Sequence, residues 1–358
     1  MSPPTPLPLG LIEGYFGRPW TWDDRRANAV FLGRLGYGFY IYAPKADPWL
    51  RRQWREPHPP PVAAEITRFA AACRRAGLRF GLGLSPYAVW SEWGVEARAA
   101  LQAKLMHLDE LGVEDLALLF DDMPGDAPAL AATQLRVIDF VAARTRAGRL
   151  WVCPTYYSND ATLDRVFGRR PRDYLTDLGR SLPPSVGVFW TGEEVCSREY
   201  APAHLDRVAE TLRRRPVLWD NYPANDGPRM SRHLHLRAPV GRGPAVQQRV
   251  LAHAVNPALQ PTLTRVVATA QALAWRLGDH YCYGEATDRA LEQVLGRRLG
   301  RQVRADLLLL QDAGLAAIDT TQRQALLQRY QAEAHPGARE IVAWLLGAYR
   351  PKKLDLLT

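Results

Sequence analysis

Two adjacent carboxylates, Asp121 and Asp122, follow an unbroken apolar run and precede Pro124. The run, residues 116–120, shows no alternation of polar and apolar side chains, which is typical of a parallel strand buried on both faces. Because proline does not continue a strand, the strand is expected to end beside the two aspartates. Two close carboxylates raise each other's tendency to hold a proton, so one can stay anionic while its neighbour acts as an acid. A helix cap is the alternative use of this pair.

Seven further apolar runs precede turn residues and stretches of helical periodicity, as the run before Asp121 does. Strands and helices that alternate in this way over roughly 250 residues predict an α/β fold, a (β/α)8 TIM barrel. A doubly wound open sheet is the alternative, but no G-x-G-x-x-G motif follows any of the runs, which argues against its dinucleotide-binding version. The predicted strands are residues 9–13, 37–42, 79–84, 115–121, 150–154, 186–190, 216–220 and 250–255.

The ends of the helices between these strands carry recognisable signals. Residues 21–24 resemble a capping box, in which Thr21 and Asp24 would satisfy the first backbone N–H groups of a helix. Glycines that end helices are expected at Gly36, Gly77, Gly112 and Gly148.

The last part of the chain has a different pattern. Residues 284–350 contain no predicted strand, and apolar residues recur at helical spacing over 305–318, 322–332 and 339–349. We therefore expect two parts, a catalytic barrel at residues 1–280 and a small C-terminal helical extension at 281–358. The extension is expected to cover the barrel, with a dimer contact as the alternative, so the protein would be a monomer or a homodimer.

Charge and cysteine content restrict the partners. The formal net charge is +9, but the arginines are spread over presumed helices and no basic run is interleaved with aromatics, so no nucleic-acid partner is expected. No segment resembles a signal sequence or a membrane span, which predicts a soluble, cytoplasmic protein with no membrane partner. The four cysteines have no C-x-x-C spacing, so neither a zinc cluster nor a disulfide framework is predicted.

The residues that follow the strands are the candidate site, because catalytic groups of a barrel gather at the carboxyl ends of its strands. Aromatic rings, carboxylates, amides and one lysine occur there, and this set suits a sugar: rings cover the apolar face of a pyranose while polar groups bind its hydroxyls. Lys45 is notable because the chain otherwise uses arginine almost throughout; a surface lysine is the alternative.

Other residues in this set have ordinary structural explanations. Tyr15, Phe16, Trp190 and Trp219 are individually expected to be packing residues more often than ligand contacts. The polar residues Asn221, Asp226 and Asn256 could equally belong to turns. His233 and His235 lie two apart, which indicates an exposed loop and not a metal site.

Seven motifs, in order from about residue 9 to residue 275, resemble the catalytic domain of family 84 glycoside hydrolases. That family contains β-N-acetylglucosaminidases that remove O-linked GlcNAc from proteins, and bacterial enzymes once called hyaluronidases. The motifs are Glu13-Gly14-Tyr15-Phe16-Gly17-Arg18-Pro19-Trp20, Tyr42-Ala43-Pro44-Lys45, Leu119-Phe120-Asp121-Asp122, Cys153-Pro154-Thr155-Tyr156-Tyr157, Trp190-Thr191-Gly192, Trp219-Asp220-Asn221 with Ala224-Asn225-Asp226, and Asn256-Pro257.

The resemblance implies a retaining, metal-independent mechanism without a cofactor, in which the 2-acetamido oxygen of the substrate attacks the anomeric carbon and forms an oxazoline. By position, Asp121 resembles the residue that orients the acetamido N–H, and Asp122 resembles the general acid and base. Tyr157 resembles the tyrosine that hydrogen-bonds the acetamido group, and Trp219 a wall of its pocket. The positions that resemble ligands of the sugar hydroxyls are Gly14, Lys45, Asn221, Asp226 and Asn256.

The expected activity is exo-acting hydrolysis of terminal β-linked GlcNAc from a glycoside or glycoconjugate. The alternatives are hyaluronidase-like cleavage within an acidic GlcNAc polymer, which the basic charge favours, and a GlcNAc-binding module without turnover. The order Tyr15-Phe16 and the presence of Tyr156 depart from the family pattern, and both are expected to adjoin the pocket. The chain also lacks the additional modules of the family's secreted and animal members, which weakens the expectation of a folded protein or a long polymer as substrate.

Overall fold

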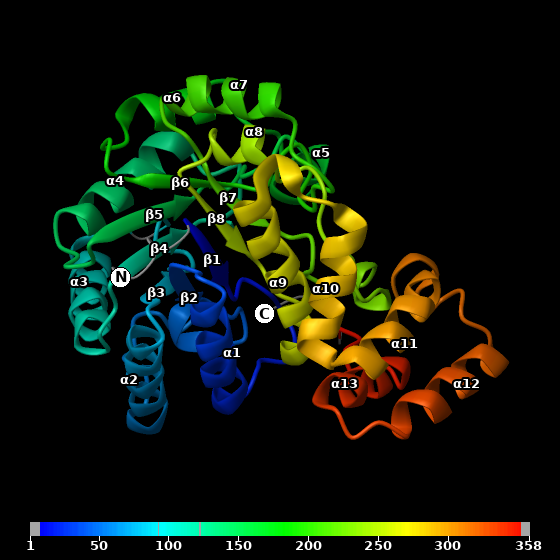
Figure 1. The fold of residues 1–358 in the computed structure, drawn as a ribbon. Coiled ribbons are helices and arrows are strands. Elements are labelled where there is room, and N and C mark those ends of the chain that lie inside the picture. Colours follow the sequence, from blue (N-terminus) through cyan, green and yellow to red (C-terminus); the bar gives the residue numbers. More distant parts are fainter. Residues whose placement is uncertain (1–7, 92, 122, 352–358) are drawn as a thin grey trace, which may run out of the picture.

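Parallel strands form a closed barrel in the computed structural model, which describes residues 8–91, 93–121 and 123–351 (Figure 1). The strands follow one another around the barrel in chain order, and β8 pairs with β1 through Leu9 and His253. This closure confirms the (β/α)8 barrel and excludes the open sheet. The strands are β1 (Leu9–Ile12), β2 (Phe39–Tyr42), β3 (Arg79–Leu84), β4 (Asp115–Leu119), β5 (Arg149–Cys153), β6 (Gly187–Trp190), β7 (Val217–Asp220) and β8 (Ala252–Val255).

All eight predicted strands are present, with ends that differ from the prediction by at most two residues. The strand before the aspartates is buried from Asp115 to Leu119, as its apolar composition predicts, and Phe120 beyond it is also buried. It ends earlier than expected because ladder pairing with β5 stops at Leu119. Asp121 therefore belongs to the loop above the barrel.

Helices surround the barrel, and most of the predicted end signals are confirmed. The Thr21 hydroxyl accepts a hydrogen bond from the Asp24 N–H at 3.1 Å, which forms the capping box of α1. Gly36, Gly77 and Gly112 have φ near +80°. The expectation for Gly148 is wrong: α4 ends before it, and Gly148 directly precedes β5. The helices are α1 (Trp22–Arg34), α2 (Pro60–Arg75), α3 (Val95–Glu110), α4 (Leu130–Ala142), α5 (Ala161–Phe167), α6 (Tyr174–Ser181), α7 (Pro202–Leu212), α8 (Pro244–Gln247) and α9 (Pro261–Leu277).

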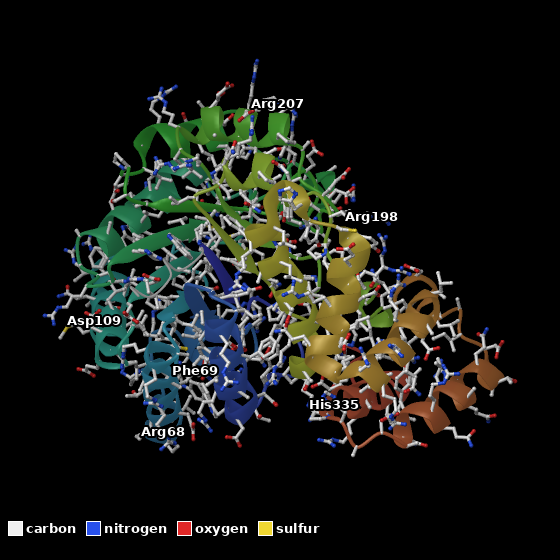
Figure 2. The ribbon with its side chains drawn as sticks, in the orientation of Figure 1. Arg68, Phe69, Asp109, Arg198, Arg207 and His335 are labelled. Carbon is white, nitrogen blue, oxygen red and sulfur yellow. The ribbon has the colours of Figure 1, made fainter. Side chains whose placement is uncertain are left out.

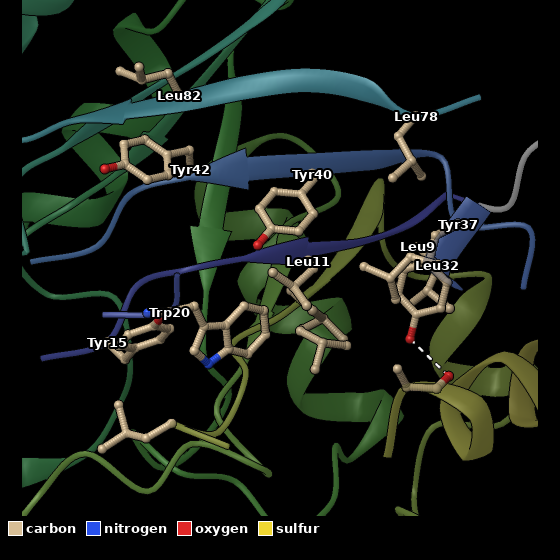
Figure 3. Close-up of a cluster of buried hydrophobic side chains, with 14 of the residues drawn as sticks. Leu9, Leu11, Tyr15, Trp20, Leu32, Tyr37, Tyr40, Tyr42, Leu78 and Leu82 are labelled. Atoms are coloured by element: carbon tan, nitrogen blue, oxygen red, sulfur yellow. Dashed lines mark hydrogen bonds between the residues drawn. The ribbon is translucent and has the colours of Figure 1, made fainter. Parts of the chain in front are cut away.

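The hydrophobic core has two parts, because successive side chains of a strand point to opposite faces. One part fills the barrel and includes Ile12, Leu119 and Trp219. The other lies between strands and helices; Figure 3 shows its portion beside β1 and β2, where the Tyr37 hydroxyl donates to the Ala268 carbonyl at 3.0 Å. The alternation fixes which residues at the strand ends face the barrel axis.

The C-terminal part of the chain is helical, and residues 284–351 contain no strand (Figure 1). Two of its helices, α10 and α13, pack against α9. The helix predicted at 305–318 is wrong in its bounds. Here α11 ends at Leu307, a π-helical turn follows, and Gly314 with φ +70° ends that turn. The C-terminal helices are α10 (Tyr283–Leu295), α11 (Arg297–Leu307), the π-helical turn η4 (Leu308–Ala313), α12 (Thr320–Gln331) and α13 (Pro336–Leu345).

Charged side chains are spread over the surface, as Arg68, Asp109 and Arg207 illustrate on three different helices (Figure 2). In the part of the chain that the structure describes, no helix combines the length and apolar character that spanning a bilayer requires.

Candidate active site

Five of the predicted site residues lie at equivalent positions above the barrel. Each follows, by two residues, a side chain that fills the barrel interior, so alternation directs all five toward the axis. In each motif the alternation of inward and outward side chains continues beyond the end of the strand, and this places the five residues at the barrel mouth. The pairs of interior and site residue are Ile12 and Gly14, Ala43 and Lys45, Leu119 and Asp121, Trp219 and Asn221, and Ala254 and Asn256.

Lys45 and Asp121 form an ion pair, with 2.5 Å between the Lys45 Nζ and the Asp121 Oδ2. Both side chains are largely withdrawn from solvent, being 3% and 12% exposed. The backbone N–H of Lys45 donates to the Tyr15 carbonyl at 3.0 Å, which fixes its loop against the loop after β1. The alternative of a surface lysine is therefore wrong, and the ammonium stabilises a negative charge on Asp121 at the centre of the barrel mouth.

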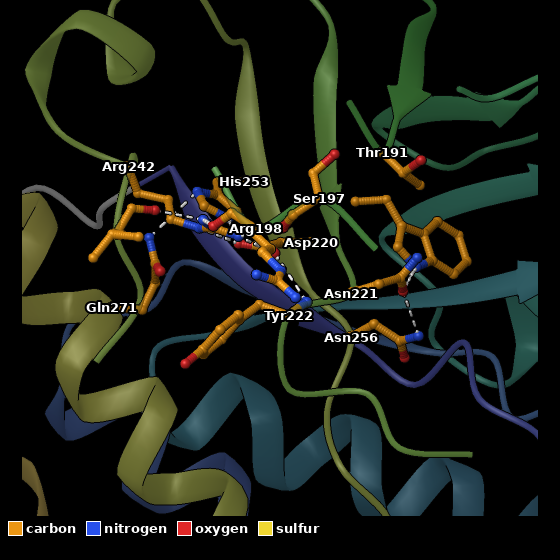
Figure 4. A network of polar contacts seen from close by, with 12 residues as sticks. Thr191, Ser197, Arg198, Asp220, Asn221, Tyr222, Arg242, His253, Asn256 and Gln271 are labelled. Atoms are coloured by element: carbon orange, nitrogen blue, oxygen red, sulfur yellow. Dashed lines mark hydrogen bonds and ion pairs between the residues drawn. The ribbon is translucent and has the colours of Figure 1, made fainter. Parts of the chain in front are cut away.

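A chain of amide hydrogen bonds joins the loops after β7, β8 and β1, and Figure 4 shows its portion between Asn221 and Asn256. The Asn221 Oδ1 accepts from the Trp219 indole N–H at 3.0 Å and from the Asn256 Nδ2 at 2.8 Å. The Asn256 Oδ1 accepts from the Gly14 N–H at 3.0 Å. These bonds cross between strands, so Asn221 and Asn256 do not serve only as turn residues, and the orientation of both amides is fixed.

The absence of a side chain at Gly14 makes room for Trp219. A Cβ atom at Gly14 would lie 2.0 Å from the Cζ2 atom of the indole. Trp219 is 4% exposed and packs among the barrel-interior side chains. The indole therefore forms a rigid apolar wall against the backbone of the loop after β1.

Asp226 reaches the site from the loop after β7. Its Oδ2 accepts a hydrogen bond from the Phe16 N–H at 2.8 Å, which connects that loop to the one after β1. Burial raises the pKa of the Asp226 carboxyl, and the nearby Lys45 ammonium acts in the opposite direction. Asp226 thus belongs to the same charged centre as Lys45 and Asp121.

Two predicted residues are less defined. Tyr157 packs against the barrel-interior side chains, and its carbonyl accepts the Thr191 N–H at 2.9 Å. Asp122, the predicted general acid, lies outside the described residues.

Among the residues that are described, no group of three or more histidine, cysteine, aspartate or glutamate side chains is placed to hold a metal ion.

Two other carboxylates at strand ends face away from the barrel axis, because each lies one position before a residue that faces the axis. Glu13 is fully buried and its Oε1 lies 2.8 Å from the Arg25 Nε. Asp220 is held by Arg242 and by the His253 Nε2, each at 2.8 Å (Figure 4). These groups support the barrel mouth from outside and do not belong to the pocket.

Several aromatic residues near the motifs are packing residues. The Tyr15 hydroxyl donates to Glu13 at 3.0 Å, and the Trp190 indole N–H donates to the His204 Nε2 at 3.0 Å. Tyr156 is fully buried and its hydroxyl donates to the Gly168 carbonyl at 2.5 Å. The rings of Tyr15 and Tyr156 pack in the outer layer, so neither ring adjoins the site as expected. Phe16 of the same Tyr15-Phe16 pair does, since the Lys45 Nζ lies 6.0 Å from the centre of its ring.

Sequence reasoning missed the backbone that positions Asn221. The Val195 carbonyl accepts from the Asn221 Nδ2 at 2.8 Å, and the Val195 N–H donates to the Asp160 Oδ2 at 3.2 Å. Asp160 also accepts from Thr162 at the start of α5. Its place before that helix is a visible capping signal, but its contact with Val195 crosses 35 residues and has no local signal.

A cavity of about 1340 Å³ adjoins the site on the side of Val195. Its walls come from the loops after β6 and β7 and from the C-terminal helices. They include Glu194, Cys196, Tyr222, His233, Tyr283 and Leu308. The expectation that His233 and His235 lie on an exposed loop is wrong, since both are half-buried and the His233 Nδ1 lies 2.8 Å from the Gln311 carbonyl oxygen. Both residues line this cavity.

Comparison with known proteins identifies a family that this chain resembles. The family model described as β-N-acetylglucosaminidase matches residues 9–311. Protein O-GlcNAcase from Mus musculus and from Rattus norvegicus are each 29% identical over 226 residues, which cover 61% of this chain and 24% of each relative. The chain thus spans about a quarter of those relatives. A solved mutant of the Thermobaculum terrenum O-GlcNAc hydrolase aligns with a TM-score of 0.78 and 26% identity, covering 95% of this chain and 80% of that one.

Proposed function

This chain belongs to the β-N-acetylglucosaminidase family of glycoside hydrolases, and we propose that it removes terminal β-linked GlcNAc by substrate-assisted catalysis. The observation that carries the proposal is the Lys45–Asp121 ion pair at the axis of the barrel, beside the fixed amides of Asn221 and Asn256. A buried anion beside fixed amides can hold an acetamido N–H in place without attacking the sugar itself.

In the first step the acetamido oxygen attacks the anomeric carbon while the bond to the leaving oxygen breaks. Asp122 gives its proton to that oxygen, and Asp121 stabilises the positive charge that develops on the acetamido nitrogen. The product of this step is an oxazoline that keeps its N–H proton, an oxazolinium ion paired with the Asp121 carboxylate. No carboxylate becomes bonded to the sugar, in contrast to glycosidases that use one as the nucleophile.

In the second step water attacks the anomeric carbon and Asp122 takes its proton. The bond between the anomeric carbon and the oxazoline oxygen breaks, which restores the acetamide with retained configuration. We assign Tyr157 to the acetamido group and Trp219 to the wall of its pocket. Sugar hydroxyls are assigned to Gly14, Lys45, Asn221, Asp226 and Asn256.

Turnover of fluorogenic β-glycosides tests the activity. GlcNAc should be cleaved, and glucose should not, because glucose lacks the acetamido nucleophile. Appreciable glucosidase activity would argue against substrate assistance, and binding of GlcNAc without any turnover would leave a binding module.

Substitution of the two aspartates tests their roles. Asp122→Asn should abolish hydrolysis when the leaving group is poor, because such a group needs a proton, and should spare the first step when it is good. Asp121→Asn should impair hydrolysis with every leaving group. Full activity in both variants would rule out the mechanism.

The second candidate is cleavage within an acidic GlcNAc polymer. Arg198 and Arg229 line the adjoining cavity, and neither forms an ion pair with a carboxylate in the described part of the chain. Incubation with hyaluronan oligomers distinguishes the candidates, because an exo-acting enzyme does not cut within the polymer.

A further inference from the structure

The loop between β7 and α8, residues 221–243, connects two parts of the molecule. At its start it carries Asn221, and further on it carries Asp226, whose carboxylate accepts the Phe16 N–H. From Ser231 onward the same loop lies against the C-terminal helices. Contacts that fix residues 231–243 of this loop therefore also influence the position of Asp226.

Gln311, in the π-helical turn η4, bonds the β7–α8 loop through both atoms of its side-chain amide. Its Oε1 accepts from the backbone N–H groups of Leu236 at 2.8 Å and Arg237 at 2.9 Å. Its Nε2 donates to the Tyr222 hydroxyl at 3.2 Å, and that hydroxyl donates in turn to the Arg237 carbonyl at 3.2 Å. One amide thus joins the start of the loop to residues 236 and 237. Tyr222 directly follows Asn221, and both are labelled in Figure 4.

Backbone contacts on either side keep Gln311 in register with the loop. The Leu234 N–H donates to the Leu310 carbonyl at 3.0 Å, and the Leu315 N–H donates to the Arg232 carbonyl at 2.8 Å. At Gly314, which has φ +70°, a Cβ atom would lie 2.6 Å from the Arg232 carbonyl oxygen. Single π-helical turns are often retained at functional positions, and this one directs Gln311 at the loop.

A further bond attaches the loop to the last helix. The Trp344 indole N–H donates to the Ser231 carbonyl at 3.0 Å, and Trp344 is buried in α13. On the opposite side of the loop, the Asn225 Nδ2 donates to the Gln260 Oε1 at 2.8 Å and its Oδ1 accepts from Leu259 at 2.9 Å. Asp226 thus stands between an anchor on the barrel and an anchor on the C-terminal helices.

We propose that Gln311 is a positioning residue for the sugar site. It holds the β7–α8 loop so that Asp226 and Asn221 have their substrate-binding positions before substrate binds. The assignment of Asp226 as a sugar ligand rests on the proposed function. Without the amide, the loop samples other positions, and substrate binding must then select the competent one. Apparent affinity falls by the competent fraction, while the chemical step in the filled site is unchanged.

The test compares Gln311→Leu with Gln302→Leu. Gln302 lies in α11, is also half-buried, and makes no hydrogen bond to the loop among the described residues, so it controls for the same change in the same group of helices. With an aryl GlcNAc glycoside, Gln311→Leu should raise KM about fivefold or more and change kcat by less than about twofold. Gln302→Leu should leave both constants as in the unsubstituted protein.

Gln311→Glu is the conservative substitution, and it should retain the KM that Gln311→Leu loses. Its carboxylate keeps the acceptors for Leu236 and Arg237 and can accept from the Tyr222 hydroxyl, so KM should stay within about twofold of the original value. A lower unfolding temperature in Gln311→Leu with an unchanged KM would show a merely structural role and overturn the proposal. If Gln311→Leu does not fold, Tyr222→Phe, which removes the bond between the side chains, should raise KM and carries the test.

Hydrogen exchange of the backbone amides separates failure of this inference from failure of the proposed function. In Gln311→Leu the amides of residues 225–237 should exchange faster, while those of β3 should not change. If the unsubstituted protein turns over no GlcNAc glycoside, the proposed function fails, but faster exchange in this segment still supports the positioning role. Unchanged exchange in residues 225–237 overturns it.

Discussion

The Nζ atom of Lys45 lies 2.5 Å from the Oδ2 atom of Asp121, across the mouth of the barrel from β2 to β4. The two residues are 76 positions apart in the chain and meet only because both have inward strand parity. In a site this withdrawn from water, the pair stabilises the anion that the proposed mechanism requires at Asp121.

Removal of the ammonium should therefore reduce catalysis more than folding. Lys45→Met keeps most of the side-chain volume but leaves the Asp121 charge without this partner, and a hydrogen bond to a charged group contributes about 1.5–3 kcal/mol. We expect kcat/KM to fall about tenfold to a hundredfold. Steady-state kinetics with an aryl GlcNAc glycoside measures this. The matched control is Lys104→Met, at a second buried lysine, whose ammonium donates to the Glu56 carbonyl. Equal kinetics in the two variants would refute the role of Lys45.

A methyl group at Gly14 should displace the wall of the pocket. Gly14→Ala brings a Cβ atom to 2.0 Å from the Trp219 ring, so the indole must leave the position that we assign to the wall of the acetamido pocket. We expect kcat/KM to fall at least about a hundredfold, since misplacement of about 1 Å can cost that much, with a circular dichroism spectrum like that of the original protein. Gly243→Ala, where a Cβ atom would meet no atom within 4 Å, should be fully active. An active Gly14→Ala enzyme would disprove the close approach.

The buried Asp220 carboxylate should give a pH-dependent contribution to stability. Burial opposes its ionisation, but Arg242 and His253 outweigh burial and hold the pKa of Asp220 below its ordinary range. A carboxyl whose folded pKa is lowered stabilises the fold above its unfolded pKa, and this contribution is lost as the pH falls. Asp220→Asn leaves Arg242 buried without its partner and should cost about 3–5 kcal/mol at pH 7. Urea unfolding should show the difference from the original protein narrowing below about pH 4; a difference that widens in acid would contradict this assignment.

The buried Lys104 ammonium should destabilise the fold at neutral pH, and this cost should shrink at alkaline pH. Burial lowers its pKa from 10.5 to about 8, and its ammonium donates to the Glu56 carbonyl at 2.6 Å. The unfolded chain therefore binds more protons between these two values, so the stability contribution of this group rises as the pH rises through them. Lys104→Met should be more stable than the original protein at pH 7, by up to about 3 kcal/mol less the lost hydrogen bond. The advantage should shrink toward pH 10 in urea unfolding, and an advantage that is constant with pH would refute the cause.

The sequence alone determined the order of elements. Continuous apolar runs such as residues 116–120 are typical of strands covered on both faces, and eight of them separated by helical stretches favour a barrel. Closure itself was decided by the pairing of β8 with β1, which excludes the open sheet. It also determined which motifs stand at the strand ends, because a strand, its turn and its helix are local in the chain. The C-terminal bounds were less predictable, because a π-helical turn at Leu308–Ala313 has no distinctive periodicity.

Only the tertiary structure decided which strand-end residues face the site. Glu13 and Gly14 are neighbours, as are Asp220 and Asn221, and in each pair one faces the axis and the other a buried arginine. When a strand is apolar on both faces, its sequence does not show which side chains point toward the barrel axis. No sequence pattern therefore separates the pocket residues from those behind them. The contacts of Lys45 with Asp121 and of Gln311 with the β7–α8 loop join distant segments, and such pairs exist only once the barrel has closed and the helices have packed.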